Sequence, residues 1–302
     1  MADRIIFYDQ IARNKRNSVF LIIAIIIVFI LLGYIIGMVL GPDYFTIIMI
    51  ASIIISVFYV WIGYYNSDKI ALASVSAKLA DPTKHRMLYD TVESMALASG
   101  NPMPKVYIMP GNQINAFATG RNPQHAVVCV TEGALLKLDK KELEGVIAHE
   151  MGHVGNYDIR FMTLVAVLVG MVAILSELFL RSLWYSGGGG DNEDAGKVKI
   201  VLILAGVILA ILAPLVTSLV QLAISRKREY SADATAVKFI RSPTGLISAL
   251  KKIKNENEPV KKGQVSQAVA PLFIGDPFKR KVQSLFSTHP DINKRISILE
   301  RM

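Results

Sequence analysis

Four long apolar runs constrain the fold of this chain more than any other feature. They cover residues 18–40, 44–65, 161–180 and 200–225, and only the third contains a charged residue, Glu177. An α-helix rises about 1.5 Å per residue, so about 20 apolar residues are needed to cross the hydrocarbon core of a bilayer. Each run therefore predicts a transmembrane helix, and the lipid bilayer is the first expected partner.

Composition favours a membrane protein over a nucleic-acid-binding one. Hydrophobic residues make up 52% of the chain and charged residues only 19%, which is too apolar for an ordinary soluble domain. The net charge of +9 comes from basic residues beside the apolar runs, among them Lys69, Lys78 and residues 226–228, whereas residues 191–194 form an acidic loop. This asymmetry predicts a multi-pass protein of the plasma or inner membrane, with both termini and the soluble regions in the cytoplasm and no nucleic-acid partner.

The apolar runs divide the chain into five parts. We expect a cytoplasmic tail, a transmembrane hairpin, a soluble region, a second transmembrane hairpin with an outer loop at 184–198, and a soluble C-terminal part. Their predicted bounds are 1–17, 18–66, 67–159, 160–225 and 226–302. Nothing in the sequence sets the oligomeric state.

The first soluble region carries signals for a helix and a small sheet. Asp81 and Pro82 are typical of a helix start, and Gly100 is typical of a helix end. Three short apolar segments between Pro and Gly residues predict strands, at Lys105–Met109, Asn115–Thr119 and Ala126–Thr131. The predicted fold class is α+β, mainly α-helical, with about four transmembrane helices and a cytoplasmic catalytic domain that carries a small β-sheet.

The motif His149-Glu150-Met-Gly-His153 carries the strongest chemical signal. Asp139 is a plausible N-cap for its helix, with Glu142 in the capping-box position three residues later. Side chains four apart lie on one face of a helix, so the two histidines can take two corners of a tetrahedral zinc site. Glu150 lies on the neighbouring flank, where a carboxylate can reach a water molecule at the metal without being a ligand. The alternative is a pair of surface histidines on an ordinary helix.

A third ligand is expected near the end of the fourth apolar run. Glu229 and Asp233 are four apart on a probable helix, and Glu229 can complete a His, His, Glu site with one position left open. Asp233 or Asp158 can accept a hydrogen bond from the outer nitrogen of a ligand histidine. Spacing alone equally allows Glu229 to pair with Arg226 or Arg228 in a solvated charge cluster.

The placement of the third and fourth runs favours ligation. His153 lies about eight residues before the third run, and Glu229 lies about one turn beyond the fourth. If these two spans form an antiparallel hairpin, their ends bring the two side chains together close to the membrane surface.

Four segments, in order, resemble the HtpX-type membrane metalloproteases, which belong to the wider group that also includes the Ste24 CAAX proteases. They are residues 115–125, 149–158, 225–233 and 287–296. The resemblance implies a zincin-like domain that holds one zinc ion (Zn2+) per chain and cleaves damaged membrane proteins and other unfolded polypeptides. It also implies roles for single residues: metal ligands at His149, His153 and Glu229, and a general base at Glu150. Cys129 stands where a small residue such as Ala is expected.

Two further groups are candidates for binding substrate. An edge of the small sheet can pair with an extended peptide, which makes Asn115, Ala116 and Phe117 candidate substrate-binding residues, unless the sheet is an ordinary core sheet. His289 and Arg295 are candidates for stabilising the oxyanion that forms when water attacks a peptide carbonyl. The alternative for His289 is a helix-capping or surface role.

Two other functions fit parts of the sequence. One is a CAAX prenyl protease of the Ste24 kind, although four spans are few for the enclosed chamber that this resemblance implies. The other is a non-catalytic membrane scaffold with a relic zinc site. The intact Glu150 argues against the scaffold, because metal storage alone does not require it.

Overall fold

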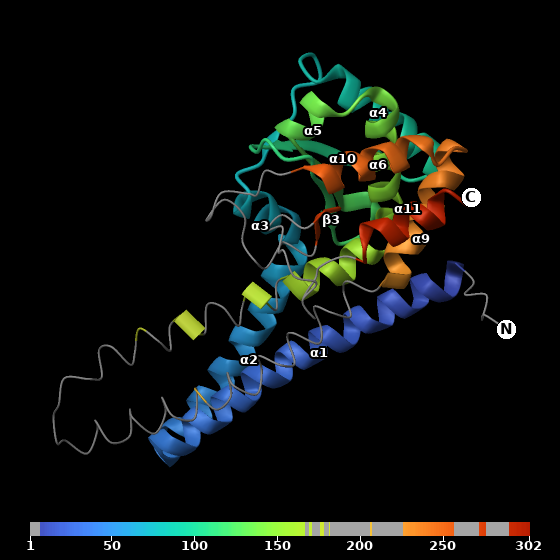
Figure 1. Cartoon of the computed structure of the whole chain (residues 1–302). Helices are drawn as coiled ribbons and strands as arrows, with labels where there is room; N and C mark the ends of the chain where they lie inside the picture. The colour runs from blue at the N-terminus through green and yellow to red at the C-terminus, as the bar shows by residue number, and fades with distance from the viewer. Residues whose placement is uncertain are drawn as a thin grey trace.

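The molecule consists of a long helical hairpin attached to a globular part that contains a small sheet (Figure 1). The computed structural model describes residues 7–166, 169–170, 176–177, 181, 206, 226–256, 272–275 and 290–302. The hairpin is formed by α1 (Phe7–Leu40) and α2 (Pro42–Tyr65). The chain reverses direction between them at Gly41, whose φ of 106° lies in the region that favours glycine.

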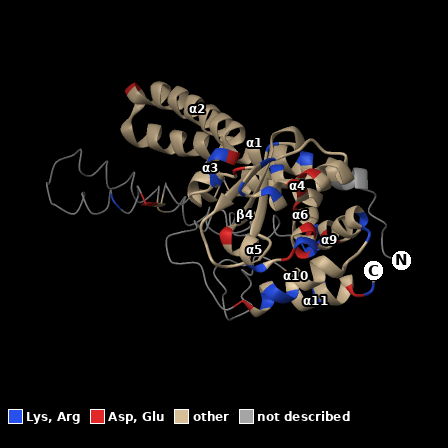
Figure 2. Cartoon of the chain, turned by 90° about the horizontal axis from the view of Figure 1, so that it is seen from above, with Lys and Arg blue, Asp and Glu red and all other residues tan. Residues whose placement is uncertain are grey.

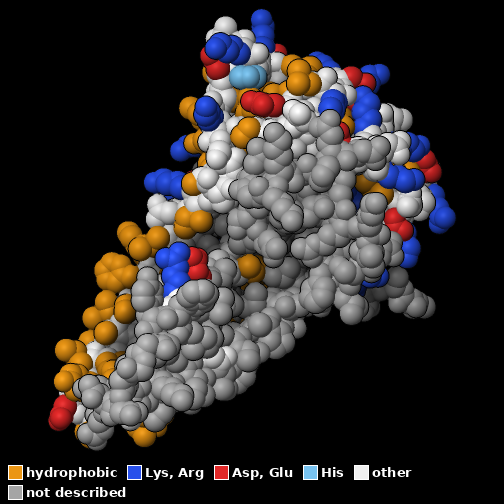
Figure 3. Space-filling view, turned by 60° about the vertical axis from the view of Figure 1, so that its left-hand side comes forward, with side chains coloured by type: hydrophobic (Ala, Val, Ile, Leu, Met, Phe, Trp, Pro, Cys, Tyr) orange, Lys and Arg blue, Asp and Glu red, His pale blue; other side chains and the backbone are white. Residues whose placement is uncertain are grey.

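The hairpin has the surface expected of a membrane anchor. Within the described residues, Ile11–Leu40 and Pro42–Tyr65 are the two helical segments long and apolar enough to cross a membrane, and little of either is buried in the protein. Its exposed side chains are mostly hydrophobic (Figure 3), whereas charged side chains gather on the globular part (Figure 2). The first two apolar runs are therefore helical, as predicted.

The first helix starts earlier than the apolar run that predicted it. It has 34 residues and begins at Phe7 rather than near residue 18. Arg and Lys are good helix formers, so the basic segment before the run continues the helix. At about 1.5 Å per residue the helix is about 50 Å long, well beyond the roughly 30 Å of a hydrocarbon core. Its first turns consequently reach the globular part.

The globular part is mostly helical and holds one four-stranded sheet. Its helices are α3 (Ser67–Ser74), α4 (Arg86–Ser99), α5 (Glu132–Lys137), α6 (Lys140–Gly155), α9 (Arg226–Ile240), α10 (Thr244–Asn255) and α11 (Ile292–Leu299), with a 3-10 turn η1 at Pro123–His125. Its strands are β1 (Lys78–Leu79), β2 (Lys105–Met109), β3 (Ala116–Gly120) and β4 (Ala126–Thr131). Residues 158–166 are also helical. The remainder of the predicted second hairpin, including its outer loop at 184–198, lies almost entirely outside the described residues.

Most local predictions for the first soluble region hold. The bounds of β2 and β4 match the predicted strands, β3 is shifted by one residue, and Gly100 ends α4 in the left-handed conformation with φ 66°. The predicted start of α4 is wrong, because the helix begins at Arg86 rather than after Pro82. The Asp81 carboxylate accepts hydrogen bonds from the next two backbone N–H groups beyond Pro82, which builds a turn there instead of a helix cap.

The sheet is buried on both faces, and β3 is at its edge. The strand order is β1-β2-β4-β3, with β2 and β4 parallel and the outer pairs antiparallel. Alternate residues of the strands contribute to two separate hydrophobic clusters, one on each face of the sheet. The sequence of β4 is therefore almost continuously apolar, because side chains on both of its faces are buried. One cluster contains residues of α4, α6 and α10, and the other contains Leu21 and Ile25 of α1.

Helix α6 is the central element of the globular part. It packs against α4, α9, α10 and the sheet, and nearly all of its residues from Leu143 onward are buried. The predicted capping box is present: Asp139 accepts a hydrogen bond from the backbone of Glu142, and Glu142 accepts one from the backbone of Asp139. Gly145 allows α10 to approach closely, because a Cβ atom there would lie 2.5 Å from the backbone nitrogen of Leu246.

The Glu142 carboxylate also joins α6 to α10. It accepts hydrogen bonds from Ser248 at 2.6 Å, from Lys252 at 2.6 Å and from the Asp139 backbone at 2.8 Å. Burial by itself raises the pKa of Glu142, but these three hydrogen bonds outweigh burial and lower it below its ordinary value. The ionised form is therefore favoured in the folded protein.

We predict that Glu142→Gln destabilises the protein in a pH-dependent way. A lowered folded-state pKa contributes stability above the unfolded-state pKa of about 4.3, and this contribution disappears as the pH falls through the folded-state value. At pH 7 the substitution should cost about 1–2 kcal/mol, since Lys252 is partly exposed and screened. Denaturant unfolding in detergent measures the free energy of unfolding of the unmodified protein and of Glu142→Gln at pH 7 and at pH 3.5. The difference between the two proteins should be smaller at the lower pH. Glu144→Gln, which breaks only a 4.0 Å surface ion pair with Lys140, is the matched control and should cost about 0.5 kcal/mol or less.

Candidate metal centre and active site

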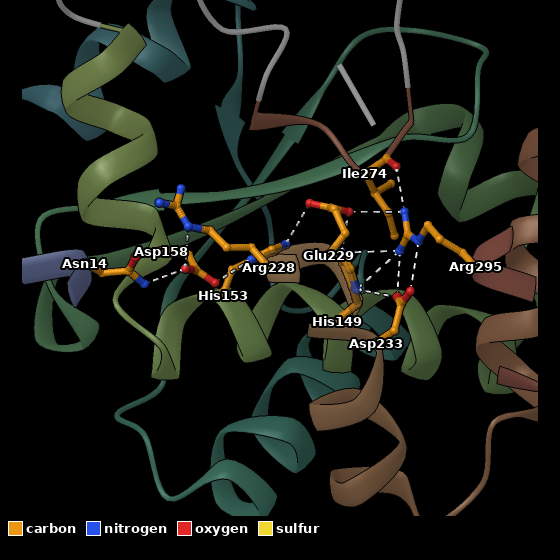
Figure 4. A network of polar contacts seen from close by, with 9 residues as sticks. All are labelled: Asn14, His149, His153, Asp158, Arg228, Glu229, Asp233, Ile274 and Arg295. Atoms are coloured by element: carbon orange, nitrogen blue, oxygen red, sulfur yellow. Dashed lines mark hydrogen bonds and ion pairs between the residues drawn. The ribbon is translucent and has the colours of Figure 1, made fainter. Parts of the chain in front are cut away.

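His149 and His153 project from the same face of α6 into the protein interior. Both are buried, and their rings stand edge to face with centroids 4.8 Å apart. The interpretation as surface histidines is therefore wrong. Helical periodicity places the side chains together, and the packing of α9 over α6, with Arg295 of α11 beside His149, removes them from solvent (Figure 4).

Glu229 of α9 reaches the two histidines from the opposite side. Its Oε2 atom lies 3.6 Å from His149 Nε2, and its Oε1 atom lies 3.5 Å from His153 Nε2. One donor atom from each of the three residues lies within 4.8 Å of the others, and all three side chains are buried. The alternative of a solvated charge cluster is excluded by this burial. Two imidazole nitrogens and a carboxylate form a set that could hold a metal ion.

Each histidine is oriented by a carboxylate on its outer nitrogen. His149 Nδ1 lies 2.9 Å from Asp233 Oδ1, and His153 Nδ1 lies 3.0 Å from Asp158 Oδ2. A hydrogen bond at Nδ1 leaves the lone pair of the neutral ring at Nε2, which is the atom that faces Glu229. The sequence predicts Asp233 or Asp158 for a single supporting role, whereas in the structure Asp233 contacts His149 and Asp158 contacts His153.

The charges around these residues shift their pKa values in opposite directions. Burial lowers the pKa of His149, and the positive charge of Arg295 lowers it further. Burial also lowers the pKa of His153, but its hydrogen bonds to Asp158 and Glu229 prevail and raise it well above the ordinary value. The carboxylates of Asp158 and Glu229 therefore stabilise a positive charge on the His153 ring.

Arg295 of α11 holds the carboxylates at the rim of the site. Its guanidinium binds Asp233 through two hydrogen bonds of 2.9 and 2.7 Å, and its Nη1 atom lies 3.3 Å from Glu229 Oε2. Burial raises the pKa of Asp233, but Arg295 and the hydrogen bond to His149 lower it to about 2. Asp233 is consequently ionised at any ordinary pH.

Glu150 occupies the flank of α6 beside the two histidines. It is buried, and burial raises its pKa to about 7, although the nearby charge of His153 acts in the other direction. A hydrogen bond from the backbone of Ala118 in β3 also acts on its carboxylate. A carboxylate whose pKa lies near neutrality can both take up and release a proton at the working pH.

Residues 82–302 match the model of peptidase family M48. The chain belongs to this family. Among curated proteins, a protease HtpX homolog of Caldanaerobacter subterraneus subsp. tengcongensis is 45% identical over 296 residues, which cover 98% of this chain and 97% of that protein. A protease HtpX homolog of Listeria monocytogenes serotype 4a is 41% identical over 305 residues, covering 98% and 99%.

The fold also resembles that of a longer protein of known structure. The crystal structure of Ste24p from S. mikatae superposes with a TM-score of 0.51 at 20% identity. The match covers 95% of this chain and 65% of that one, so the two share a fold but differ in length. Together with the two apolar helices, the family identifies this M48 protein as a membrane metalloprotease.

The three candidate substrate residues of this M48 protein lie at an edge that is partly covered. The Asn115 side chain exchanges hydrogen bonds with the backbone of Gly275, at 3.0 and 3.2 Å, and the Ala116 carbonyl accepts one from Ile274 N at 2.9 Å. Phe117 is buried against Phe273 with ring centroids 5.1 Å apart. Substrate binding at Asn115, Ala116 and Phe117 therefore stays a prediction.

Of the two candidates for oxyanion stabilisation, Arg295 can be located in the structure and His289 cannot. Arg295 lies in the site, where its guanidinium binds Asp233, Glu229 and, at 3.4 Å, the Ile274 carbonyl. Contact with a substrate oxyanion stays a prediction for this residue. His289 lies outside the described residues.

Sequence reasoning missed two contributors to the M48 site. Residues 272–275 contact β3 and Arg295, and no motif marks them. Asn14 of α1 binds Asp158 from a position 144 residues away. A signal for Asn14 did exist: together with Ser18, Leu21 and Ile25 it forms one helical face, and all four side chains are buried.

Proposed function

We propose that this M48 protein is a zinc endopeptidase that cleaves unfolded segments of membrane proteins and other damaged polypeptides. The observation that carries the proposal is the convergence of His149, His153 and Glu229, from two helices, within a buried space. His149 and His153 contribute their Nε2 atoms and Glu229 its carboxylate, so one zinc ion per chain would have three protein ligands and an open position, as catalytic zinc requires.

The donor spacing fits zinc. Bonds of about 2.0–2.1 Å in a tetrahedral arrangement separate neighbouring donors by about 3.3–3.4 Å. His149 Nε2 lies 3.6 Å from Oε2 of Glu229 and His153 Nε2 lies 3.5 Å from Oε1, which are both close to this value, and one donor atom from each of the three residues lies within 4.8 Å of the others. Mixed imidazole and carboxylate donors with hydrogen-bonded outer nitrogens are the usual support of a zinc ion. A bound zinc ion supplies Lewis acidity, which polarises a peptide carbonyl and acidifies water.

Glu150 is proposed as the general base and acid. Its carboxylate takes a proton from the attacking water and delivers it to the nitrogen of the leaving amine, so that it ends the cycle ionised. Arg295 is proposed to keep Asp233 and Glu229 in place through its ion pairs, and His289 and Arg295 remain candidates for contact with the oxyanion.

The edge of β3 beside Glu150 is proposed to bind the substrate as an added strand. The carbonyl of Asn115 accepts a hydrogen bond from Thr131 N on the β4 side. Backbone groups alternate along a strand, so those of Ala116 and Ala118 point away from β4. The Ala116 carbonyl is already bonded to Ile274 N, so a substrate would pair beyond it, toward Ala118. The Ala118 backbone interacts with Glu150, which brings an extended peptide at this edge next to the base. Main-chain pairing makes few demands on side chains, as a protease for damaged proteins requires.

The membrane placement is proposed from charge and span length. Helices α1 and α2 form the first hairpin, and the apolar runs at 161–180 and 200–225 are proposed to form a second, which would make four spans. The basic residues that flank the spans support a cytoplasmic location for the catalytic part and both termini, and the membrane is proposed to be a plasma or inner membrane. Juxtamembrane loops and cytoplasmic tails of other membrane proteins are then within reach of the site.

Removal of the metal tests this function. We predict that protein purified in detergent contains about one zinc ion per chain and cleaves casein. A strong chelator should abolish cleavage because the open coordination position is lost, and one equivalent of zinc should restore it. Elemental analysis and a fluorescent-casein assay measure the two quantities.

Three outcomes separate this function from its alternatives. Cleavage of a farnesylated CAAX peptide, with an unlipidated peptide and casein left intact, would support the Ste24-like prenyl protease. Stoichiometric metal without cleavage of any of these substrates would support a scaffold with a relic site. Casein cleavage that persists after complete loss of metal would contradict both metal-dependent functions, the zinc endopeptidase and the prenyl protease.

A further inference from the structure

The first membrane helix contacts Asp158, the carboxylate that binds the outer nitrogen of His153, through the buried side-chain amide of Asn14. The Asn14 Nδ2 group donates hydrogen bonds to Asp158 Oδ1 at 2.6 Å and to the Asn156 carbonyl at 3.0 Å. Asn14 is 2% exposed and lies in the part of α1 that precedes the uncharged run. Figure 4 shows the resulting series of contacts, from Asn14 through Asp158 to His153 and Glu229.

The two oxygens of Asp158 have separate tasks. Oδ2 binds the outer nitrogen of His153 at 3.0 Å, whereas Oδ1 binds Asn14 and lies 3.4 Å from Arg228 Nε. Because a carboxylate is rigid and planar, a donor that fixes Oδ1 also fixes the direction of Oδ2. The orientation of the His153 ring therefore depends on Asn14 as well as on Asp158.

The turn that carries Asp158 needs this support. Tyr157 has a φ of 58°, in the left-handed region that residues with a side chain rarely adopt. Asn14 binds the residues on both sides of Tyr157, and the Lys15 ammonium lies 4.3 Å from the centre of the Tyr157 ring. The first turns of α1 thus hold an unfavourable turn in the one conformation that points Asp158 at His153.

We propose that Asn14 is a positioning residue for the metal centre, so that the first membrane helix is part of the catalytic apparatus and not only an anchor. The inference rests on the proposed role of His153 as a metal ligand. It assigns Asn14 no contact with substrate or metal. Its effect passes through Asp158 to the orientation and basicity of the imidazole.

The test compares metal retention in four variants of the full-length protein in detergent. Asn14→Ala removes the donor, and Asn14→Leu removes it while keeping most of the volume. Asn17→Ala makes the same substitution one turn along α1, at a residue that makes no hydrogen bond to the globular part among the residues that the structure describes. Leu21→Ala weakens the packing of α1 against the sheet without touching Asp158. The rate of zinc loss to a chelator, the visible spectrum of the cobalt-substituted protein, the unfolding midpoint and the kinetics of casein cleavage are measured for each.

Both Asn14 variants should lose zinc about tenfold faster than the unmodified protein, at the lower end of the 10- to 100-fold effect known for direct hydrogen-bond partners of ligand histidines. Their cobalt spectra should shift, and kcat should fall with KM little changed. Asn17→Ala should match the unmodified protein. Leu21→Ala should lower the unfolding midpoint while zinc loss and the cobalt spectrum stay the same.

Two results would overturn the inference alone. One is zinc loss and a cobalt spectrum in both Asn14 variants that match Asn17→Ala. The other is zinc loss accelerated as much by Leu21→Ala as by Asn14→Ala, which would assign the effect to docking of the helix. An unmodified protein that binds no metal would instead overturn the proposed function, and the inference with it.

Discussion

Glu150→Gln should lower the rate of casein cleavage by about 10²- to 10⁴-fold, the range that a positioned general base contributes. The amide has the shape of the carboxyl group but cannot take a proton from water. Zinc content should stay at the level of the unmodified protein, since Glu150 is not among the three residues whose donor atoms converge. The unfolding midpoint should not fall, because the substitution removes a buried carboxylate whose pKa burial already raises to about 7.

The measurement needs activity and metal from the same preparation. Glu144→Gln makes the same change six residues earlier on α6, at a residue whose one ion pair within the described part of the chain is a 4.0 Å contact with Lys140, and it should leave cleavage unchanged. Cleavage by Glu150→Gln at the unmodified rate would remove Glu150 from the role of base. Loss of zinc in this variant would instead make Glu150 part of the metal site.

Glu229→Gln should weaken zinc binding by at least about a hundredfold and abolish cleavage at limiting zinc. The binding free energy of structural zinc sites is about 10–16 kcal/mol. Glu229 is the anionic ligand among the three, so its loss should remove several kcal/mol of this binding free energy. The amide keeps the volume of the side chain but no longer neutralises the ion or pairs with Arg295, whose Nη1 atom lies 3.3 Å from Oε2. Chelator competition measures the affinity, and the casein assay measures the activity.

Glu93→Gln is the matched control for this prediction. Glu93 is exposed on α4, and its substitution should change neither zinc affinity nor cleavage. If Glu229→Gln binds zinc as tightly as the unmodified protein and cleaves casein at the same rate, the third ligand must be sought elsewhere. Together with the Glu150 variant, the result separates residues that hold the metal from residues that move protons.

Several features of the protein follow from the sequence because they are local. The regular repeat of the α-helix places His149 and His153 on one face, independently of how the rest of the chain folds. The capping box of Asp139 and Glu142 forms within four residues, and the left-handed end of α4 needs only Gly100. The first two apolar runs are helical for the same reason, since every backbone hydrogen bond of a helix is satisfied within the run.

Local patterns also failed where two of them competed. Asp81 and Pro82 are as typical of a turn as of a helix start, and the Asp81 carboxylate accepts the backbone N–H groups that build the turn. Hydropathy predicts a tail for the basic segment before the first apolar run, because hydropathy marks only the apolar part of a helix. The Arg and Lys residues of this segment continue α1 without interruption, which carries Asn14 to the globular part.

Tertiary structure alone decided how the distant parts meet. Spacing left Glu229 free to join a charge cluster, and only the packing of α9 on α6 brings its carboxylate to both histidines. The sequence could not assign Asp233 to His149 and Asp158 to His153, nor foresee that Ile274 pairs with β3 and that Asn14 holds Asp158. The physical reason is that helix and strand periods are set by bonds between near neighbours. Contacts across the chain depend instead on which apolar faces bury one another, and no single segment contains that information.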